Sequence, residues 1–425
     1  MRIAVVGSGI SGLTAAHLLS RRHAVTVYEA ASDHLGGHTQ THTVDVGGRT
    51  HRVDTGFIVF NDWTYPRFMA LMRALGVTWR PSDMSFSVRS EVTGLEYNGT
   101  SLNALFAQRT NLFRPSFLGM VREILRFNRE APAVLELEGP GPTLGEYLER
   151  GGYGEPFVRD YILPMGAAIW SATRSAMLAF PAKSFVRFFA NHGFLSVDDR
   201  PTWQVVEGGS SSYLEPLCRP FAERIRRGTP VERVARRPGG VDVTPRGGST
   251  ETYDQVVLAC HSDQALALLS DPTEAEHEVI GAIPYQPNEV VLHTDASLMP
   301  RKRLAWAAWN YHLTDHGTGP SEAPVAVTYW MNKLQSLEAE EQLLVTLNWS
   351  DRIDPRRVLR RLVYHHPVYG HPTVAAQARW AEVSSHERRT WYCGAYWFHG
   401  FHEDGVRSGL RVAEAFGESL AGAPA

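Results

Sequence analysis

Three glycines near the start of the chain have the spacing of a phosphate-binding turn. Gly7, Gly9 and Gly12 form the pattern G-x-G-x-x-G, and the acid Glu29 follows them. The first glycine of this pattern permits a tight turn, the second lets the backbone approach a pyrophosphate, and the third lets a helix pack closely on a strand. An acid at the position of Glu29 accepts a hydrogen bond from a ribose hydroxyl and disfavours a 2′-phosphate. These residues therefore predict a dinucleotide-binding site.

The elements that such a site needs surround these residues. Residues 2–6 are an apolar run typical of a buried parallel strand, residues 11–20 have the spacing of a helix, and residues 24–28 are expected to form a second strand. A helix that starts directly behind a glycine turn points its free N–H groups at a phosphate. This order of strand, turn, helix, strand and acid distinguishes the pattern from a chance match in a chain with 37 glycines.

Further strands of the same sheet are expected much later in the chain. Residues 231–260 resemble three strands joined by turns at 238–240 and 246–249, and the last strand, 256–259, is apolar enough to rejoin a parallel sheet. The C-terminal stretch again has the pattern of a strand, a glycine loop and a helix. A nicotinamide dehydrogenase would complete its nucleotide fold in one continuous stretch, so this interruption favours a flavin that is held permanently.

We therefore predict an α/β protein with two domains. The interrupted, Rossmann-like cofactor domain comprises residues 1–60, 205–265 and 385–425. The substrate domain comprises residues 61–204 and 266–384, and is expected to combine helices at 102–189 with a mixed β-sheet at 288–349.

Composition limits the class of protein. A chain of 425 residues exceeds one ordinary core, which agrees with two domains. The net charge of −3 gives no global attraction to nucleic acid, and no stretch is apolar for long enough to span a membrane. The three cysteines have neither disulfide nor zinc-type spacing, and the glycine pattern begins too early to leave room for a signal peptide. We expect a cytoplasmic protein.

Several motifs resemble the flavin-containing amine oxidase superfamily, which includes protoporphyrinogen oxidases and the phytoene (carotenoid) desaturases. They are the three glycines with Glu29, Leu35-Gly36-Gly37, the "VERV" strand with "YDQVVLA", and the glycine loop before the last helix. Within this superfamily, the chain is more closely similar to a bacterial subgroup described as NAD/FAD-binding proteins, which also resembles the amino-terminal half of plant cyclopropane fatty acid synthases. The stretches that carry this similarity are "GGHTQT", "DTGFIVFN", "YPRFMALMRALGV", "SDMSFSV", "LPMGAAIWS" and "GFHEDGVRSG".

The resemblance covers nearly the whole chain and implies an amine-oxidase-like fold with FAD as cofactor. It implies that Glu29 binds the adenosine ribose and that backbone groups of Val234 hold the adenine. The residues implied to hold the pyrophosphate are Gly7, Ser8, Gly9, Ser11 and Gly12, and those implied to lie beside the pyrophosphate and the flavin are Gly36, Gly37 and His38. The residues implied to face the ribityl chain and the pyrimidine edge of the flavin are Gly394, Asp404, Gly405 and Val406. A helix beginning near Val406 would direct its N–H groups at the flavin, where negative charge develops on reduction.

Two positions depart from the superfamily. It usually has arginine at the position of His38 and an acid at the position of Ala395, so the contacts with phosphate and the ribityl chain are expected to differ here. No cysteine lies in a flavin-attachment motif, so the FAD is expected to be non-covalent.

The resemblance to cyclopropane synthases implies a lipid acyl chain as substrate, desaturated or oxidised by hydride transfer to flavin N5. The alternatives are an amine-oxidase-type or isomerase flavoenzyme with another substrate, and a non-catalytic FAD-bound partner of a cyclopropane synthase-like methyltransferase. Aromatic residues outside the cofactor segments could line an apolar tunnel or simply fill a core. The arginine-rich stretch 105–130 is compatible with peripheral contact with the inner face of a membrane and equally with a solvated helix face.

A catalytic base is required if a C–H proton leaves together with the hydride. The candidates are His402, Glu403, Tyr396 and His192. The histidine-rich stretches "HHPVYGH" and "HGFHED" are interrupted by proline and glycine and lack ligand spacing, so no metal site is predicted.

Overall fold

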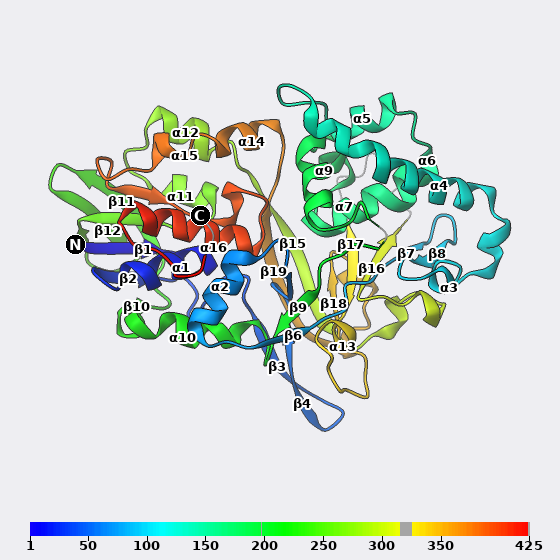
Figure 1. The fold of residues 1–425 in the computed structure, drawn as a ribbon. Helices are drawn as coiled ribbons and strands as arrows, with labels where there is room; N and C mark the ends of the chain where they lie inside the picture. The colour runs from blue at the N-terminus through cyan, green and yellow to red at the C-terminus, as the bar shows by residue number, and fades with distance from the viewer. Residues whose placement is uncertain (197, 315–324, 424–425) are drawn as a thin grey trace.

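The computed structural model describes residues 1–196, 198–314 and 325–423. Two lobes are visible in Figure 1, one built on a parallel sheet and one on a mixed sheet. The parallel sheet has the order β10-β2-β1-β14-β20. Its strands are β1 (Arg2–Val6), β2 (Ala24–Tyr28), β10 (Ile225–Arg226), β14 (Gln255–Leu258) and β20 (Thr390–Tyr392). The predicted return of the "QVVL" strand is therefore confirmed, since β14 pairs in parallel with β1.

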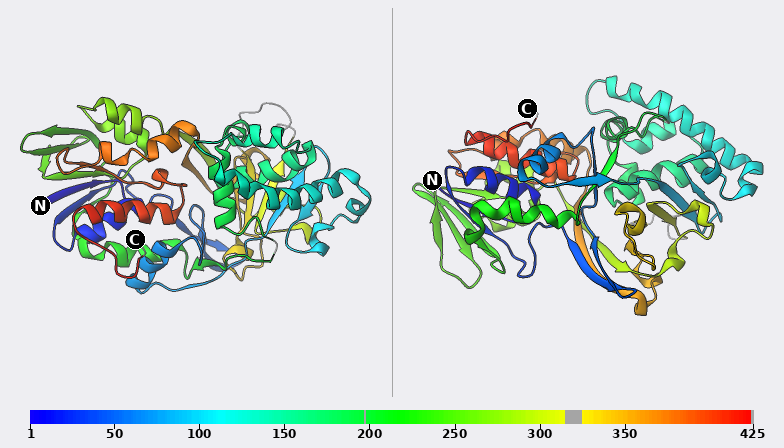
Figure 2. Two further views of the ribbon diagram at one scale, coloured as in Figure 1. Left: turned by 45° about the horizontal axis from the view of Figure 1, so that its top comes forward. Right: turned by 60° about the horizontal axis from the view of Figure 1, so that its bottom comes forward.

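Two helices cover one face of this sheet. They are α1 (Ile10–Leu19) and α16 (His402–Ala415), which lie side by side (Figure 1, Figure 2). Glycines allow this close packing, because a Cβ added at Gly405 would lie 2.5 Å from Ile10 Cγ2, and one at Gly409 would lie 2.5 Å from the carbonyl oxygen of Ser11.

The helix α16 begins four residues before Val406, the start expected from the sequence. The carboxylate of Asp404 accepts hydrogen bonds from the N–H groups of His399 and Phe401, and so stabilises an earlier first turn. His402 therefore opens the helix, and Val406 is fully buried within it.

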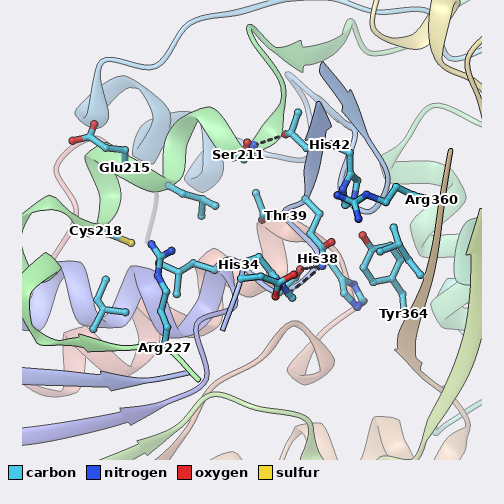
Figure 3. A pocket seen from close by; sticks show the side chains of 18 of the residues that line it. His34, His38, Thr39, His42, Ser211, Glu215, Cys218, Arg227, Arg360 and Tyr364 are labelled. Atoms are coloured by element: carbon cyan, nitrogen blue, oxygen red, sulfur yellow. Dashed lines mark hydrogen bonds and ion pairs between the residues drawn. The ribbon is translucent and has the colours of Figure 1, made fainter. Parts of the chain in front are cut away.

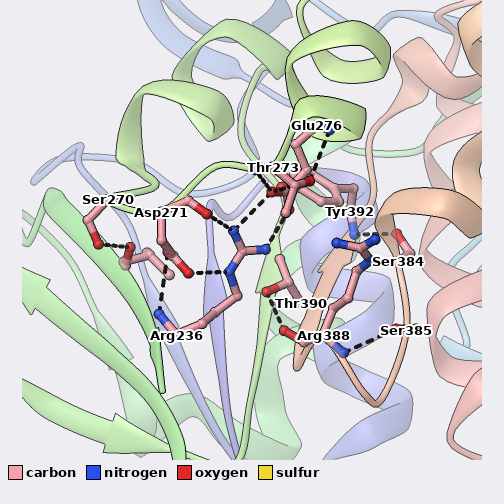
Figure 4. A network of polar contacts seen from close by, with 11 residues as sticks. Arg236, Ser270, Asp271, Thr273, Glu276, Ser384, Ser385, Arg388, Thr390 and Tyr392 are labelled. Atoms are coloured by element: carbon pink, nitrogen blue, oxygen red, sulfur yellow. Dashed lines mark hydrogen bonds and ion pairs between the residues drawn. The ribbon is translucent and has the colours of Figure 1, made fainter. Parts of the chain in front are cut away.

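An antiparallel meander packs on the other side of the parallel sheet. It consists of β11 (Val231–Arg237), β12 (Gly240–Pro245) and β13 (Glu251–Tyr253). Arg236 in β11 forms ion pairs with Asp271 and with Glu276 of α12 (Glu274–Ile280), and Glu276 also accepts a hydrogen bond from Tyr392 of β20 (Figure 4). This network joins the meander, a helix and the sheet.

The second lobe contains a seven-stranded mixed sheet of order β19-β15-β18-β17-β16-β7-β8. The strands are β7 (Phe86–Ser90), β8 (Glu96–Asn98), β15 (Tyr285–His293), β16 (Trp309–Leu313), β17 (Ala326–Trp330), β18 (Leu344–Leu347) and β19 (Val358–Pro367). The predicted mixed sheet is confirmed; residues 315–324, within the expected strand-rich segment, lie outside the described residues. One face of this sheet carries Val290, Tyr329 and Leu347, and helices pack on it. These helices lie mainly between residues 102 and 189, where the sequence predicts helices.

The remaining elements connect the two lobes or cover them. The shorter strands are β3 (Thr41–Val46), β4 (Arg49–Asp54), β5 (Val59–Asn61), β6 (Trp79–Pro81) and β9 (Trp203–Val206). The remaining helices are α2 (Pro66–Leu75), α3 (Leu102–Leu105), α4 (Pro115–Glu130), α5 (Leu144–Arg150), α6 (Glu155–Phe157), α7 (Leu163–Trp170), α8 (Arg174–Leu178), α9 (Ala182–Asn191), α10 (Leu214–Cys218), α11 (Ser262–Leu268), α13 (Met331–Leu334), α14 (His371–Gln377) and α15 (Trp380–Val383). Among the described residues, no helix combines the length and the hydropathy needed to cross a membrane.

Each lobe has its own hydrophobic core. The core of the parallel-sheet lobe also includes side chains of α2, α12, α14 and α15, such as Phe68, Ile280 and Trp380. These helices lie outside the three stretches that the sequence assigned to the cofactor domain, so the first lobe takes part of its core from the intervening segments.

Candidate functional site

A cavity of about 610 Å³ opens at the carboxyl ends of the parallel strands, where ligands bind in folds of this type. We call it the dinucleotide cavity. It is lined by the β1–α1 turn, by Glu29 after β2, by residues 36–38, by residues after β14 and by the loop before α16. Widely separated segments thus meet at one site.

The glycine turn has the geometry that its sequence predicts. Gly7 has a φ of +106°, and a Cβ there would lie 2.8 Å from the carbonyl oxygen of Ala259. A Cβ at Gly12 would lie 2.3 Å from the carbonyl oxygen of Gly7, so this glycine permits the helix to approach the turn. A Cβ at Gly9, by contrast, would meet no atom of the described residues within 4 Å, and Gly9 is the N-cap of α1. The space in front of Gly9 is thus open to a ligand.

Most residues assigned to the cofactor line this cavity. They are Gly7, Ser8, Gly9, Ser11, Glu29, Gly36, Gly37, His38 and Gly394. The carboxylate of Glu29 accepts hydrogen bonds from the backbone N–H and the hydroxyl of Ser8, which holds it at the end of β2.

Five assigned residues lie behind the lining instead. Gly12 and Gly405 serve close packing, Asp404 binds the N–H groups that precede α16, and Val406 is part of the core. Val234 is fully buried and its carbonyl accepts the N–H of Ser270, while Val231, three residues earlier in β11, lines the cavity. A register shift between Val231 and Arg233 interrupts the regular alternation of the strand, which the "VERV" motif does not reveal.

A second cavity, of about 180 Å³, lies between the two lobes; we call it the apolar cavity. Its walls come from the mixed sheet, from α7 and α9, and from residues 55–59. Apolar side chains line it: Phe57, Ile58, Val59, Met84, Ile169, Phe188, Phe194, Trp203, Val290, Trp309, Leu347 and Phe401. The polar lining residues are threonine, serine, tyrosine and histidine, and no aspartate, glutamate, lysine or arginine stands among those the structure describes.

The two cavities meet at five residues that line both: His38, His366, Gly400, Phe401 and His402. A group bound at the inner end of the dinucleotide cavity would therefore contact a molecule in the apolar cavity. The residues of this junction come from three distant parts of the chain.

His402 is the predicted catalytic residue that lies at the junction. Its Nε2 is 3.0 Å from Thr39 Oγ1 and 3.0 Å from the hydroxyl of Tyr213, and its ring is stacked on Phe57 with the centroids 3.6 Å apart. Burial lowers the pKa of His402 to about 3, so its imidazole is neutral at physiological pH. These contacts fix its orientation at the meeting point of the cavities.

The other three candidates differ in position. Glu403, the next residue, lines neither cavity: its carboxylate accepts the backbone N–H groups of Arg67 and Phe68 at the start of α2. Tyr396 lines the dinucleotide cavity, and its buried hydroxyl has no partner within the described part of the chain. His192 lines the apolar cavity, but both ring nitrogens are engaged, with Phe188 and Thr64, and burial lowers its pKa to about 4.

Several histidines that the sequence did not identify as site residues also line the site. His261 lines the dinucleotide cavity, directly after β14, and is stacked on Tyr285. Its position after a parallel strand could have identified it from the sequence, because ligands bind at the carboxyl ends of such strands. His365 and His366, of the stretch "HHPVYGH", also line this cavity. From the sequence, a metal site was the one role that this stretch suggested, and its spacing does not favour that role. No cluster of three or more metal-ligating side chains is present in the described residues.

An open groove of about 1240 Å³ adjoins both cavities (Figure 3). It shares His38 and Tyr364 with the apolar cavity, and Gly37, His38, His261 and His365 with the dinucleotide cavity. The rings of His38 and Tyr364 are in contact, with centroids 4.9 Å apart. This pair thus forms the wall between the groove and the apolar cavity.

Comparisons with known proteins agree with this geometry. The model of the family described as "Flavin containing amine oxidoreductase" matches residues 10–416. The structure resembles cyclohexylamine oxidase from Brevibacterium oxydans IH-35A, with 15% identity, a TM-score of 0.71 and coverage of 97% of this chain and 98% of that one. It also resembles putrescine oxidase bound to putrescine, with 15% identity, a TM-score of 0.66 and coverage of 98% of this chain and 99% of that one. A third similar structure is the CLA-producing fatty acid isomerase from P. acnes, with 16% identity, a TM-score of 0.64 and coverage of 98% of each chain. At these identities the structural likeness establishes the fold.

Proposed function

Because the chain belongs to the flavin containing amine oxidoreductase family, it is an FAD-dependent oxidoreductase, and we propose that its substrate is the acyl chain of a lipid. The predictions of family, fold class, enzyme class and cofactor are thereby confirmed. The substrate, by contrast, is inferred from the chemistry of the apolar cavity.

The dinucleotide cavity suits FAD. The open space at Gly9, at the N-terminus of α1, is suited to the pyrophosphate, and Glu29 to a ribose hydroxyl. The unpartnered hydroxyl of Tyr396 offers a hydrogen bond to a bound group. The junction would then hold the flavin end, and FAD would supply there a two-electron acceptor for a hydride equivalent from a substrate carbon.

The composition of the apolar cavity carries the substrate proposal. A buried ammonium group needs a charged partner, and the described lining offers no carboxylate. Aromatic and aliphatic walls without an ionic group among the described residues suit a methylene chain. The structural likeness to a fatty acid isomerase agrees with this choice.

We propose that His402 orients the reacting carbon rather than acting as a strong base. Its pKa of about 3 makes the neutral ring a weak proton acceptor, and Glu403 is turned away towards α2. Desaturation removes a hydride and a proton from adjacent carbons, so bound FAD would supply the acceptor for the hydride, and dioxygen or another oxidant would be needed for turnover. The proton would then have to pass to a neutral histidine or to water.

The weakness of these bases favours a second candidate, migration of a double bond in an unsaturated chain. Hydride departure and return at another carbon requires no strong base and no net oxidant. The product has the same mass as the substrate, whereas desaturation yields a product with two hydrogens fewer.

The test is anaerobic mixing of the FAD-loaded protein with phospholipids that carry saturated or unsaturated acyl chains, followed by absorption spectroscopy and mass analysis of the chains. Stable bleaching of the flavin with loss of two hydrogens supports desaturation, and a positional isomer of unchanged mass supports migration. Bleaching by cyclohexylamine or putrescine but by no lipid would overturn the acyl proposal. A flavin that no substrate reduces, in a protein that copurifies with a cyclopropane synthase-like methyltransferase, would favour a non-catalytic role.

A further inference from the structure

Exposed apolar side chains are concentrated in one part of the molecule. Among the described residues, eleven large apolar side chains are exposed, and seven of them fall between residues 92 and 137. They are Val92, Leu102, Leu112, Phe113, Leu118, Leu125 and Leu137. Phe113 is 86% exposed and Leu102 is 77% exposed, which is unusual for side chains of this size.

The helix α4 presents two opposite faces. Phe117, Met120 and Phe127 are buried in the core of the second lobe. On the other side of the helix, an exposed stripe runs along its length, with successive spacings of four, three and four residues: Leu118, Arg122, Leu125 and Arg129. Leucine and arginine thus alternate on a surface that no described part of the chain covers.

The charge of this region differs from that of the whole chain. Residues 102–130 contain five arginines and two glutamates, a net charge of +3, whereas the chain carries −3. Arg126 and Arg129 pair with Glu130, and Arg122 has no ion pair within the described residues. Phe106, just after α3, contacts Phe117 of α4 through their rings, so α3, residues 109–113 and α4 form one unit.

This unit forms the end of the molecule that lies farthest from the parallel sheet (Figure 1, Figure 2). We propose that it docks on the surface of an anionic phospholipid membrane, with Leu102, Leu112, Phe113, Leu118 and Leu125 entering the acyl boundary and the arginines facing the phosphates. Interleaved cationic and apolar side chains at a protruding end complement a lipid surface better than a flat protein interface.

The test uses the FAD-loaded protein and vesicles of phosphatidylcholine with or without phosphatidylglycerol. We expect binding to the anionic vesicles that weakens as salt is raised, because exposed charges are screened. The double variants Phe113→Ser/Leu125→Ser and Arg122→Glu/Arg129→Glu each lower the bound-to-free ratio about tenfold. Arg122→Lys/Arg129→Lys retains the charge and most of the binding.

Matched controls lie on other surfaces. Val363→Ser removes another exposed apolar side chain, and Arg224→Glu/Arg233→Glu reverses two exposed charges of the other lobe; both leave binding unchanged. Absence of binding to anionic vesicles at low salt, or equal loss in the controls, would overturn the proposal. The proposal would also be overturned if the wild type does not bind vesicles and the variants instead abolish self-association or the capture of a protein partner. Vesicle binding is measured without turnover, so its outcome is independent of the substrate proposal.

Discussion

At the scale of single residues, the glycines of the phosphate turn have two different tasks. Gly12 is surrounded by backbone, since its Cβ would lie 2.3 Å from the carbonyl oxygen of Gly7, whereas Gly9 faces open space. One glycine is required for the fold and the other for the ligand. The two can therefore be separated by experiment.

We expect Gly9→Val to leave the apoprotein folded, because the φ of −64° at Gly9 suits any residue. The same substitution should weaken FAD binding by about two orders of magnitude, because the valine side chain fills the space for the phosphates. Gly12→Ala should instead lower the free energy of unfolding of the apoprotein by about 3 kcal/mol. Flavin absorbance per protein and thermal unfolding of the apoprotein measure the two effects. Equal destabilisation by both substitutions would show that Gly9 has no special relation to the ligand.

At the scale of elements, the start of α2 depends on a residue of α16. The carboxylate of Glu403 accepts the N–H groups of Arg67 and Phe68, at 3.2 Å and 2.8 Å, and so supplies an N-terminal cap from another helix. Burial raises the pKa of Glu403, but the bonds from these N–H groups favour its charged form. In the structure this carboxylate caps α2, whereas the sequence placed Glu403 among the candidate bases.

We expect Glu403→Ala to lower the free energy of unfolding by about 1–2 kcal/mol, because two helix N–H groups lose their acceptor. Glu403→Gln keeps one acceptor oxygen and should cost less. The rate of flavin reduction by a competent substrate should stay within about twofold of the wild type in both. The exposed Glu414→Gln on the same helix is the control. A loss of several orders of magnitude in reduction rate, with unchanged stability, would restore Glu403 as the base.

Some elements could be predicted and others could not. The strands β1, β2 and β14 were correctly predicted because apolar β-branched runs between turns are local signals. The start of α16 was placed too late because the cap from Asp404 depends on how the preceding glycine loop folds back. The direction of Val231 and Val234 within β11 follows from packing on other elements, which no local pattern records.

At the scale of the whole molecule, many histidines are buried or half-buried and neutral. Burial lowers the pKa of seven of them to about 3 or 4: His192, His261, His293, His312, His366, His399 and His402. Two lie in a hydrogen-bonded chain across four strands, His293–Thr346–Thr328–His312. Burial also raises the pKa of three carboxyls: Asp54 to about 6, Asp404 to about 7, and Glu403.

These shifts predict instability in mild acid. Between pH 6.5 and about 4 the unfolded chain protonates its histidines while the folded protein does not, so stability falls as pH falls. The three carboxyls act in the opposite direction, because the folded state binds their protons first, but the seven histidines outnumber them. We expect the unfolding temperature of the apoprotein to fall by about 10 °C from pH 7 to pH 5.

The apoprotein is used because several of these histidines line the cofactor cavity. The double variant His293→Gln/His312→Gln retains hydrogen-bonding groups but removes two titrating rings, and should flatten the dependence on pH. An unfolding temperature that is constant or rises towards pH 5 would contradict the burial of neutral histidines.

The sequence by itself determined the dinucleotide turn and the presence of both kinds of sheet, because glycine spacing and apolar periodicity act over a few neighbouring residues. The family followed from the resemblance of its motifs. Only the tertiary structure decided what lies around the reacting position. His402 and Glu403 are adjacent in the chain, yet one faces the junction of the cavities and the other caps α2. Their surroundings come from segments hundreds of residues away, and the position of those segments depends on packing of the entire chain.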